Sequence, residues 1–236
     1  MTNPITNDMG RFSTSVLTVK NRHSGLRIDS FDPIRDVDSL EEAVKGLRVF
    51  ERVLNTEPGQ KYLWEFRPSD MIERDVMMVT VRHDDLTIGT MQFNRDEENA
   101  LWFRAAAVLP EYGGMQLATA MGSVGLCHDA MMHLVPPKEI DAAIRQMPDG
   151  SLNEASKRSF VKLGFLLEVE PGQTYLSGRW PDRHLFSSAE FNEEGEAFIR
   201  YRRMIGEPDV ALQEAKAFLT GWTEKVLPFP KRALLT

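Results

Sequence analysis

The sequence predicts a mixed α/β fold, and three observations predict it. Apolar, β-branched runs separated by short polar turns between residues 76 and 109 are typical of an antiparallel meander. After residue 109, apolar segments with strand character alternate with amphipathic helical segments, as in β-α-β crossovers. Two further amphipathic segments follow residue 185, so we expect a helical extension at the C-terminus. A chain of 236 residues can bury a core of this kind without metals or disulfides.

The first third of the chain predicts one strand and two helices. Residues 1–25 show no clear periodicity, and we expect a poorly ordered lead-in there. Residues 26–31 alternate between apolar and polar, as a half-buried strand does. Asp36 or Asp38 can cap a helix that continues to Val53. A shorter helix interrupted by Pro68 is expected over residues 64–73.

The middle of the chain completes a main domain that we place at residues 26–185. Strands are predicted over 76–81, 86–91 and 101–109, and a helix follows the break at 110–114. A buried strand over 140–144, a helix over 153–163 and a closing pair of strands over 165–169 and 174–180 come next.

The C-terminal extension, residues 186–236, predicts two amphipathic helices. One includes Phe191, Phe198, Ile199 and Ile205, and the other runs from Val210 to Trp222. Neither helix can bury its apolar stripe alone. We therefore expect the two helices to pack on the main domain or to form a homodimer with a second copy.

Composition narrows the function classes. The net charge of −7 argues against a nucleic-acid partner or an anionic membrane, because both require a basic surface. Cys127 is the one cysteine, so no intramolecular disulfide can form and a reducing compartment is favoured. The sequence contains no run of about 18 apolar residues, so we expect no membrane span and a cytoplasmic location.

The stretch from Ala105 to Thr119 is the most informative. It predicts a strand, a turn containing Gly113 and Gly114, and the start of a helix. The first amides of a helix lack intrahelical partners and lie at the positive end of its dipole, so they can bind a phosphate. Glycines let the backbone approach such a ligand closely. A strand-to-helix turn without a ligand is the plain alternative.

Two blocks of sequence resemble the GCN5-related N-acetyltransferases (GNAT). The first is similar to the family's acetyl-CoA segment, and the second to its Asn-x-x-Ser/Ala…Lys-Leu-Gly-Phe signature about 35 residues later. The matching positions are Val108, Pro110, Tyr112, Gly114 and Ala118 in the first block and Asn153, Ser156, Lys162, Leu163, Gly164 and Phe165 in the second.

The resemblance implies a splayed central sheet flanked by helices, and a function. The protein would transfer an acetyl or other acyl group from acyl-CoA to a primary amine of a small molecule or a protein. Strand backbone at Ala106, Ala107, Val108 and Leu109 would bind the pantetheine arm. The pyrophosphate would lie on the amides of Gly113, Gly114, Met115, Gln116, Leu117, Ala118 and Thr119. Asn153, Ser156 and Phe160 would line the cofactor from the other side.

Three departures from the family pattern bear on chemistry. Gly113 stands where the family has Arg or Gln, and Gln116 stands at the family's middle glycine. Phe160 occupies the position of the tyrosine that protonates the departing thiolate, and phenylalanine has no proton to give. The remaining candidate donors are Ser156, Ser159 and Tyr112.

Two other functions stay open. The chain could use the fold as a weakly active or inactive binding protein, which Phe160 and Gln116 favour. The acceptor could instead be an amine on a modified nucleic acid, which the charge of −7 disfavours.

The acceptor site is less defined by the sequence. Arg104 could bind an acidic group of the acceptor, and Trp64 could line its pocket. Glu73, Glu98 and Glu111 are candidate bases that are more simply surface residues. The spacing of Cys127, His128 and His133 fits neither a metal site nor an activated nucleophile, so we expect no metal.

Overall fold

A computed structural model of the chain describes residues 5–6, 16–56, 59, 76–168, 173–176, 190–191 and 197–227. The helix expected over 64–73, with Trp64 and Glu73, lies outside the described residues. The described strands form one sheet in the order β1-β2-β3-β4-β5-β6-β7-β11-β10, and β8 and β9 also pair with β11. Among these strands, β6 and β7 are the only parallel neighbours. The sheet is therefore mixed, as the sequence predicts.

The strand bounds follow the predicted meander closely. The strands are β1 (Ile5–Thr6), β2 (Leu17–Lys20), β3 (Leu26–Phe31), β4 (Val76–His83), β5 (Leu86–Arg95), β6 (Leu101–Val108), β7 (Ile140–Gln146), β8 (Leu166–Leu167), β9 (Gln173–Leu176), β10 (Glu190–Phe191) and β11 (Ala197–Gly206). Asp84 and Asn99 adopt positive φ in the turns of the meander. Asparagine and aspartate tolerate this conformation better than most residues, so these positions help to define the turns.

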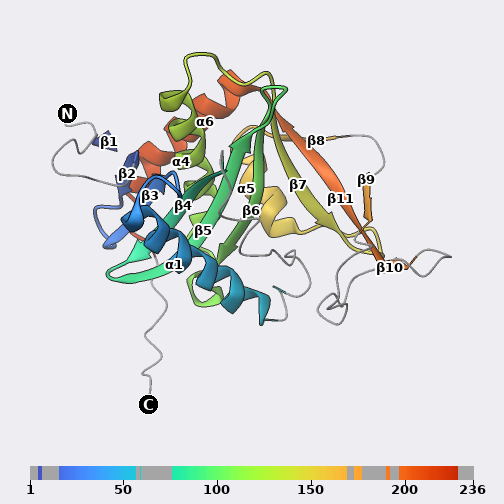
Figure 1. Cartoon of the computed structure of the whole chain (residues 1–236), viewed down its shortest axis with the longest axis horizontal. Helices are drawn as coiled ribbons and strands as arrows, with labels where there is room; N and C mark the ends of the chain where they lie inside the picture. The colour runs from blue at the N-terminus through green and yellow to red at the C-terminus, as the bar shows by residue number, and fades with distance from the viewer. Residues whose placement is uncertain are drawn as a thin grey trace.

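Helices cover both faces of the sheet (Figure 1). They are α1 (Val37–Leu54), α4 (Leu117–Met132), α5 (Glu154–Val161) and α6 (Pro208–Thr223), with a short 3₁₀ turn over Pro110–Tyr112. Helix α1 crosses one face over β4, β5 and β6, and α4 packs on the opposite face between the sheet and α6. Asp36 caps α1, as predicted, by accepting from the Ser39 amide at 2.8 Å.

Small residues bring α4 close to the sheet. A Cβ atom on Gly125 would lie 3.3 Å from the rings of Phe93 and Phe103, and one on Gly122 would lie 3.0 Å from Leu163. These approaches are tighter than ordinary van der Waals contact, so glycine allows the helix to lie directly on β5 and β6. The core between the sheet and α4 fixes the start of α4 relative to the end of β6.

The C-terminal region differs from the prediction. The segment with Phe198, Ile199 and Ile205 was expected to be a helix, and that prediction was wrong. It forms β11, which pairs with β7 over residues 200–206. The second predicted helix is present as α6. Its apolar stripe is buried against α4 of the same chain and includes Ala211, Ala215, Leu219 and Trp222.

Two smaller differences concern strand partners. Residues 17–20, within the expected lead-in, form β2, which pairs with β3 and buries Leu17 and Val19. The expected closing pair of strands corresponds to β8 and β9, and both pair with β11. The sheet therefore continues through β11 into the C-terminal region.

Candidate functional site

The central parallel strands separate after a short stretch of pairing. β6 and β7 pair over residues 101–103 and 140–142, whereas β6 continues to Val108 and β7 to Gln146. Figure 1 shows the two strands diverging from their paired ends, with α5 between them. The register of β6 against β5 also shifts at this point, because Phe93 pairs with Phe103 and Gln92 with Ala105. Arg104 is thus the extra residue of a β-bulge, and it is exposed.

The separated part of β6 has backbone groups that face the opening. The Leu109 amide donates to the Ile88 carbonyl at 2.9 Å, on the side of β5. Hydrogen-bonded residues alternate along an antiparallel strand, so Ala107 also faces β5, and Ala106 and Val108 direct their N–H and C=O groups toward the opening. Of the predicted pantetheine positions, Ala106 and Val108 are therefore available, and the N–H of Leu109 is not.

Helix α4 begins where β6 and the glycine turn end. No side chain caps its N-terminus, and no acidic residue occupies its first turn. In contrast, α1, α5 and α6 are capped by Asp36, Asn153 and Glu207. The amides of Leu117, Ala118 and Thr119 have no intrahelical acceptor, so the positive end of the α4 dipole is left for an external anion.

Backbone conformation in the turn agrees with the family's glycine pattern. Gly114 has φ of 80°, and Gln116, at the family's middle glycine, has φ of 60°. A non-glycine residue in this left-handed region is uncommon and costs about 1–2 kcal/mol. Gln116 therefore has the backbone conformation for which the family's glycine is suited.

Helix α5 faces the opening with Phe160. The Phe160 ring packs on Phe103 at 5.7 Å and on Phe165 at 5.2 Å, between ring centroids. Asn153 anchors the helix, because its amide donates to the Arg145 carbonyl of β7 and its side chain accepts from the Ser156 amide. Ser156 lies one turn before Phe160 and shares its side of the helix.

Comparison with solved structures identifies this arrangement. An N-acetyltransferase from Staphylococcus aureus Mu50 superposes with a TM-score of 0.50 at 7% sequence identity, covering 78% of this chain and 98% of the other. The fold is that of the GNAT acetyltransferases. RimJ from Mycobacterium smegmatis, in complex with CoA-disulfide, gives 0.51 at 15% identity and covers 83% of this chain and 88% of RimJ. No protein-family model and no curated protein matches the sequence.

The three predicted proton donors occupy different parts of the GNAT fold. Ser159 donates its hydroxyl to the Ala155 carbonyl at 3.0 Å, within α5. The Tyr112 hydroxyl lies 3.4 Å from His83 Nδ1, beyond the end of β6. A strand rises about 3.3 Å per residue, so Val108 lies roughly 16 Å from Phe103 and Tyr112 lies farther along. Ser156 lies on α5, one helical turn before Phe160 and on the same face.

A polar cluster that the sequence did not reveal lies where β6 and β7 still pair. Asp141 is fully buried and accepts two hydrogen bonds from Arg203 of β11, at 2.5 and 2.8 Å. These bonds, with a third to Glu139, raise the pKa of Arg203. The Arg203 guanidinium also lies 5.6 Å from the ring centroid of Trp102. Because Arg203 occupies both oxygens of Asp141, the cluster holds β6, β7 and β11 together and does not offer a free base.

Two further titratable side chains, Cys127 and His128, are buried on α4. Burial raises the pKa of Cys127 to about 11 and lowers that of His128 to about 4, so the thiol stays protonated and the imidazole neutral at pH 7. Among the described residues, no group of His, Cys, Asp or Glu side chains could hold a metal ion. Glu98 is exposed, and Glu111 lies 3.4 Å from Arg52.

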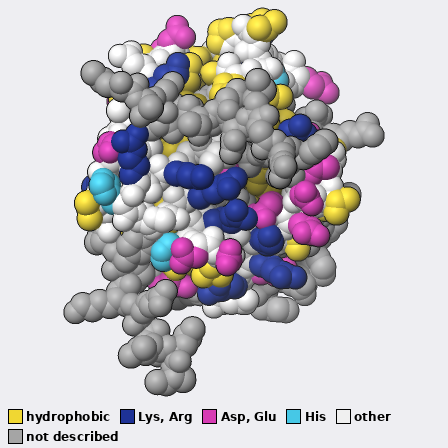
Figure 2. Space-filling model, turned by 90° about the vertical axis from the view of Figure 1, so that its left-hand side faces the viewer, with side chains coloured by type: hydrophobic (Ala, Val, Ile, Leu, Met, Phe, Trp, Pro, Cys, Tyr) yellow, Lys and Arg dark blue, Asp and Glu magenta, His cyan; other side chains and the backbone are white. Residues whose placement is uncertain are grey.

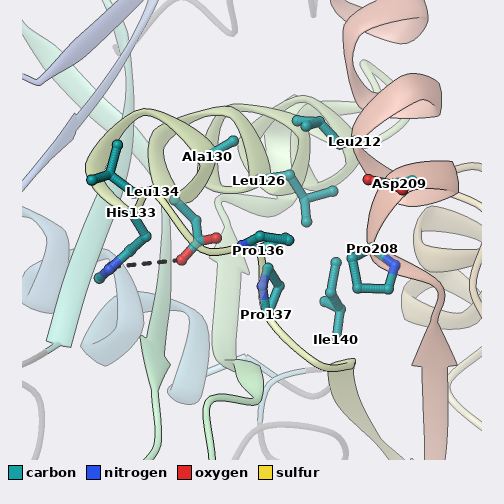
Figure 3. A pocket seen from close by; sticks show the side chains of 11 residues that line it. Leu126, Ala130, His133, Leu134, Pro136, Pro137, Ile140, Pro208, Asp209 and Leu212 are labelled. Atoms are coloured by element: carbon teal, nitrogen blue, oxygen red, sulfur yellow. Dashed lines mark ion pairs between the residues drawn. The ribbon is translucent and has the colours of Figure 1, made fainter.

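An open hollow of about 200 Å³ lies at the opposite end of α4 (Figure 3). The C-terminal part of α4, the loop at 133–137 and the first turn of α6 line it, and the ion pair between His133 and Asp129 lies at one side. This hollow is remote from the first turn of α4. It shows that α6 begins beside the end of α4.

Charge is unevenly distributed over the surface. On the face in Figure 2, Lys and Arg side chains gather near the middle, with Asp and Glu side chains close beside them. Local basic areas therefore exist despite the net charge of −7. In the described part of the chain, no helix is long and apolar enough to cross a bilayer.

Proposed function

We propose that the protein is an acyl-CoA-dependent N-acyltransferase that moves an acetyl group to a primary amine of a small molecule or a protein. One observation carries the proposal. The opening between β6 and β7 leads directly to the uncapped N-terminus of α4. A pantetheine arm can pair with Ala106 and Val108 in that opening while the pyrophosphate binds the first amides of α4. The CoA-disulfide complex of the structurally similar RimJ supports a coenzyme of this kind.

The thioester would lie at the closed end of the opening. If the pyrophosphate is bound at Gly114 to Thr119, an arm running back along β6 ends near Arg104 and Phe103. There the amine nitrogen attacks the carbonyl carbon, a C–N bond forms and the C–S bond breaks. The nitrogen loses a proton to water or a carboxylate, and the sulfur must gain one.

Ser156 is our candidate for the group that protonates the sulfur, directly or through one water. It lies one helical turn from Phe160, and the ring of Phe160 packs on Phe103 at the closed end. Ser159 is less suited because its hydroxyl donates within α5, and Tyr112 is less suited because it lies beyond the other end of β6.

A second function, coenzyme binding without turnover, is favoured by the same aromatic packing. Phe160 fills the acid position with a ring that packs on two core aromatics and carries no proton. The two functions differ in one observable, because only the transferase releases free thiol from acetyl-CoA when an amine is present.

The first experiment is a calorimetric titration with acetyl-CoA of the wild-type protein and of Ala118→Asp, with Ala118→Asn as the matched neutral control. Ala118 is half-buried in the first turn of α4. An aspartate there interacts favourably with the helix dipole by about 0.3–1 kcal/mol but repels a phosphate. We expect micromolar binding by the wild type, at least about tenfold weaker binding by Ala118→Asp at an equal or higher melting temperature, and little change for Ala118→Asn.

The outcome decides the next step. Binding with this pattern justifies a screen of primary amines for thiol release, which separates transfer from binding alone. No binding by the wild-type protein would contradict the acetyl-CoA assignment. Equal losses in the aspartate and asparagine variants would place the coenzyme away from the first turn of α4.

A further inference from the structure

A cation from the far end of the chain lies beside the start of α4. The ammonium nitrogen of Lys225 is 3.4 Å from the side-chain oxygen of Gln116, although the two residues are 109 positions apart. Gln116 immediately precedes the first turn of α4. Lys225 follows Glu224, the last residue associated with α6, and its side chain is exposed.

The antiparallel packing of α4 and α6 explains this placement. Figure 3 shows Pro208 and Leu212, at the start of α6, facing Leu126 and Ala130, near the end of α4. Because the helices run in opposite directions, α6 ends beside the N-terminus of α4. The residue after the C-cap of α6 therefore reaches the glycine turn.

The backbone at Lys225 is held firmly. Asn21, which is 4% exposed, donates its side-chain amide to the carbonyls of Trp222 and Lys225, the latter at 3.0 Å. The amide of Arg22 donates to the Thr223 carbonyl at 2.9 Å. Trp222 itself is 1% exposed. The turn between β2 and β3 thus fixes the position from which the flexible lysine side chain extends.

The charge of the neighbourhood gives this lysine a role. From Ala105 to Cys127 the sequence contains a single charged residue, Glu111, and that residue pairs with Arg52. Residues 105–127, which include the turn and the first turns of α4, therefore offer an anion backbone dipoles but no cationic side chain. A lysine at a helix N-terminus is disfavoured by the dipole unless an anion lies between them. A diphosphate placed there would satisfy both groups.

We propose that Lys225 binds the pyrophosphate of the coenzyme and supplies the positive charge that the turn itself lacks. The inference rests on the proposed function, since it concerns the same site. Gln116 holds the ammonium group near the turn, and the ammonium group donates a charge-assisted hydrogen bond to a phosphate oxygen when the coenzyme is bound. The C-terminal region is in this way part of the coenzyme site.

The test compares Lys225→Ala with Lys216→Ala in titrations with CoA and with dephospho-CoA, which lacks the 3′-phosphate but keeps the pyrophosphate. Lys216 is also exposed on α6, but it lies near Cys127, in the second half of α4, so its removal controls for net charge. We expect Lys225→Ala to weaken binding of both ligands about tenfold and Lys216→Ala to change it less than about twofold. Lys225→Arg should restore most of the affinity, and the melting temperatures should match that of the wild type.

Each contrary result has a distinct meaning. If the wild type binds CoA and Lys225→Ala binds it within about twofold, the assignment of Lys225 is wrong and the proposed function stands. If the loss occurs with CoA but vanishes with dephospho-CoA, Lys225 contacts the 3′-phosphate, which overturns the pyrophosphate assignment. If the wild type binds neither ligand, the proposed function fails as well.

Discussion

The ring of Phe160 packs edge-to-face on Phe103, with 5.7 Å between centroids and 65° between planes. Phe103 is the last residue of β6 that pairs with β7, so this contact marks the closed end of the opening between the strands. Phe160 itself is half-buried. The contact therefore joins a core interaction to the place where the proposed chemistry occurs.

Adding a hydroxyl at this position should increase turnover. In Phe160→Tyr, the ring keeps its contacts with Phe103 and Phe165, and the new hydroxyl can protonate the leaving sulfur. We expect the rate of thiol release to rise about tenfold when the acceptor is an amine found by screening. This is less than the contribution of a fully positioned general acid. Stopped-flow or plate-based thiol detection measures the rate. The dissociation constant for acetyl-CoA should not change, and Phe160→Leu should show no gain.

Removing the Ser156 hydroxyl should have the opposite effect. Ser156→Ala keeps the Asn153 cap, because that bond uses the Ser156 backbone amide. We expect kcat to fall by about tenfold or more while coenzyme affinity and melting temperature stay close to those of the wild type. Ser159→Ala serves as the comparison and should leave kcat nearly unchanged. Equal rates for Ser156→Ala and the wild type would assign the proton to water or another group.

The positive φ of Gln116 predicts an unusual order of stability. In a helix interior, alanine is more stable than glycine by about 1 kcal/mol. At Gln116, with φ of 60°, Gln116→Gly should be more stable than Gln116→Ala by about 1 kcal/mol, because glycine adopts this conformation without steric cost. Urea denaturation of the two variants measures the difference. An order that matches the helix interior would mean that the turn relaxes to negative φ.

Buried His128 should make stability fall in weak acid. Burial lowers the pKa of His128 in the folded state from an ordinary 6.5 to about 4, although the nearby charge of Asp129 acts to raise it. The Nδ1 atom of His128 lies 2.9 Å from the Ser30 hydroxyl. Below pH 6.5 the unfolded chain takes up a proton that the folded protein does not, so this group destabilises the fold increasingly as pH falls toward 4. The slope is at most about 1.4 kcal/mol per pH unit.

The matched variant for this prediction is His128→Gln, which cannot titrate. Denaturation series between pH 7 and pH 4 should show a shallower fall in the free energy of unfolding for His128→Gln than for the wild type. Parallel curves for the two proteins would show that His128 is protonated as easily in the folded state as in the unfolded state.

The sequence by itself determined the elements whose signals are local. The helix after Asp36, the meander between residues 76 and 108 and the strand, turn and helix around Gly114 all follow from side-chain periodicity, caps and turn residues. The coenzyme turn is a prediction from the sequence for the same reason, since its strand, glycines and helix are adjacent in the chain. Local patterns predict such segments because the interactions that form them span only a few residues.

Only the tertiary structure decided the features that depend on distant partners. The segment that forms β11 includes Phe198, Ile199 and Ile205 at spacings that also fit a helix. It is a strand because it pairs with β7 and because Arg203 bonds to Asp141, 62 residues away. Lys225 has no local feature that marks it as a ligand. Its place beside Gln116 results from the antiparallel packing of α6 on α4, because tertiary packing brings together side chains that sequence spacing alone does not relate.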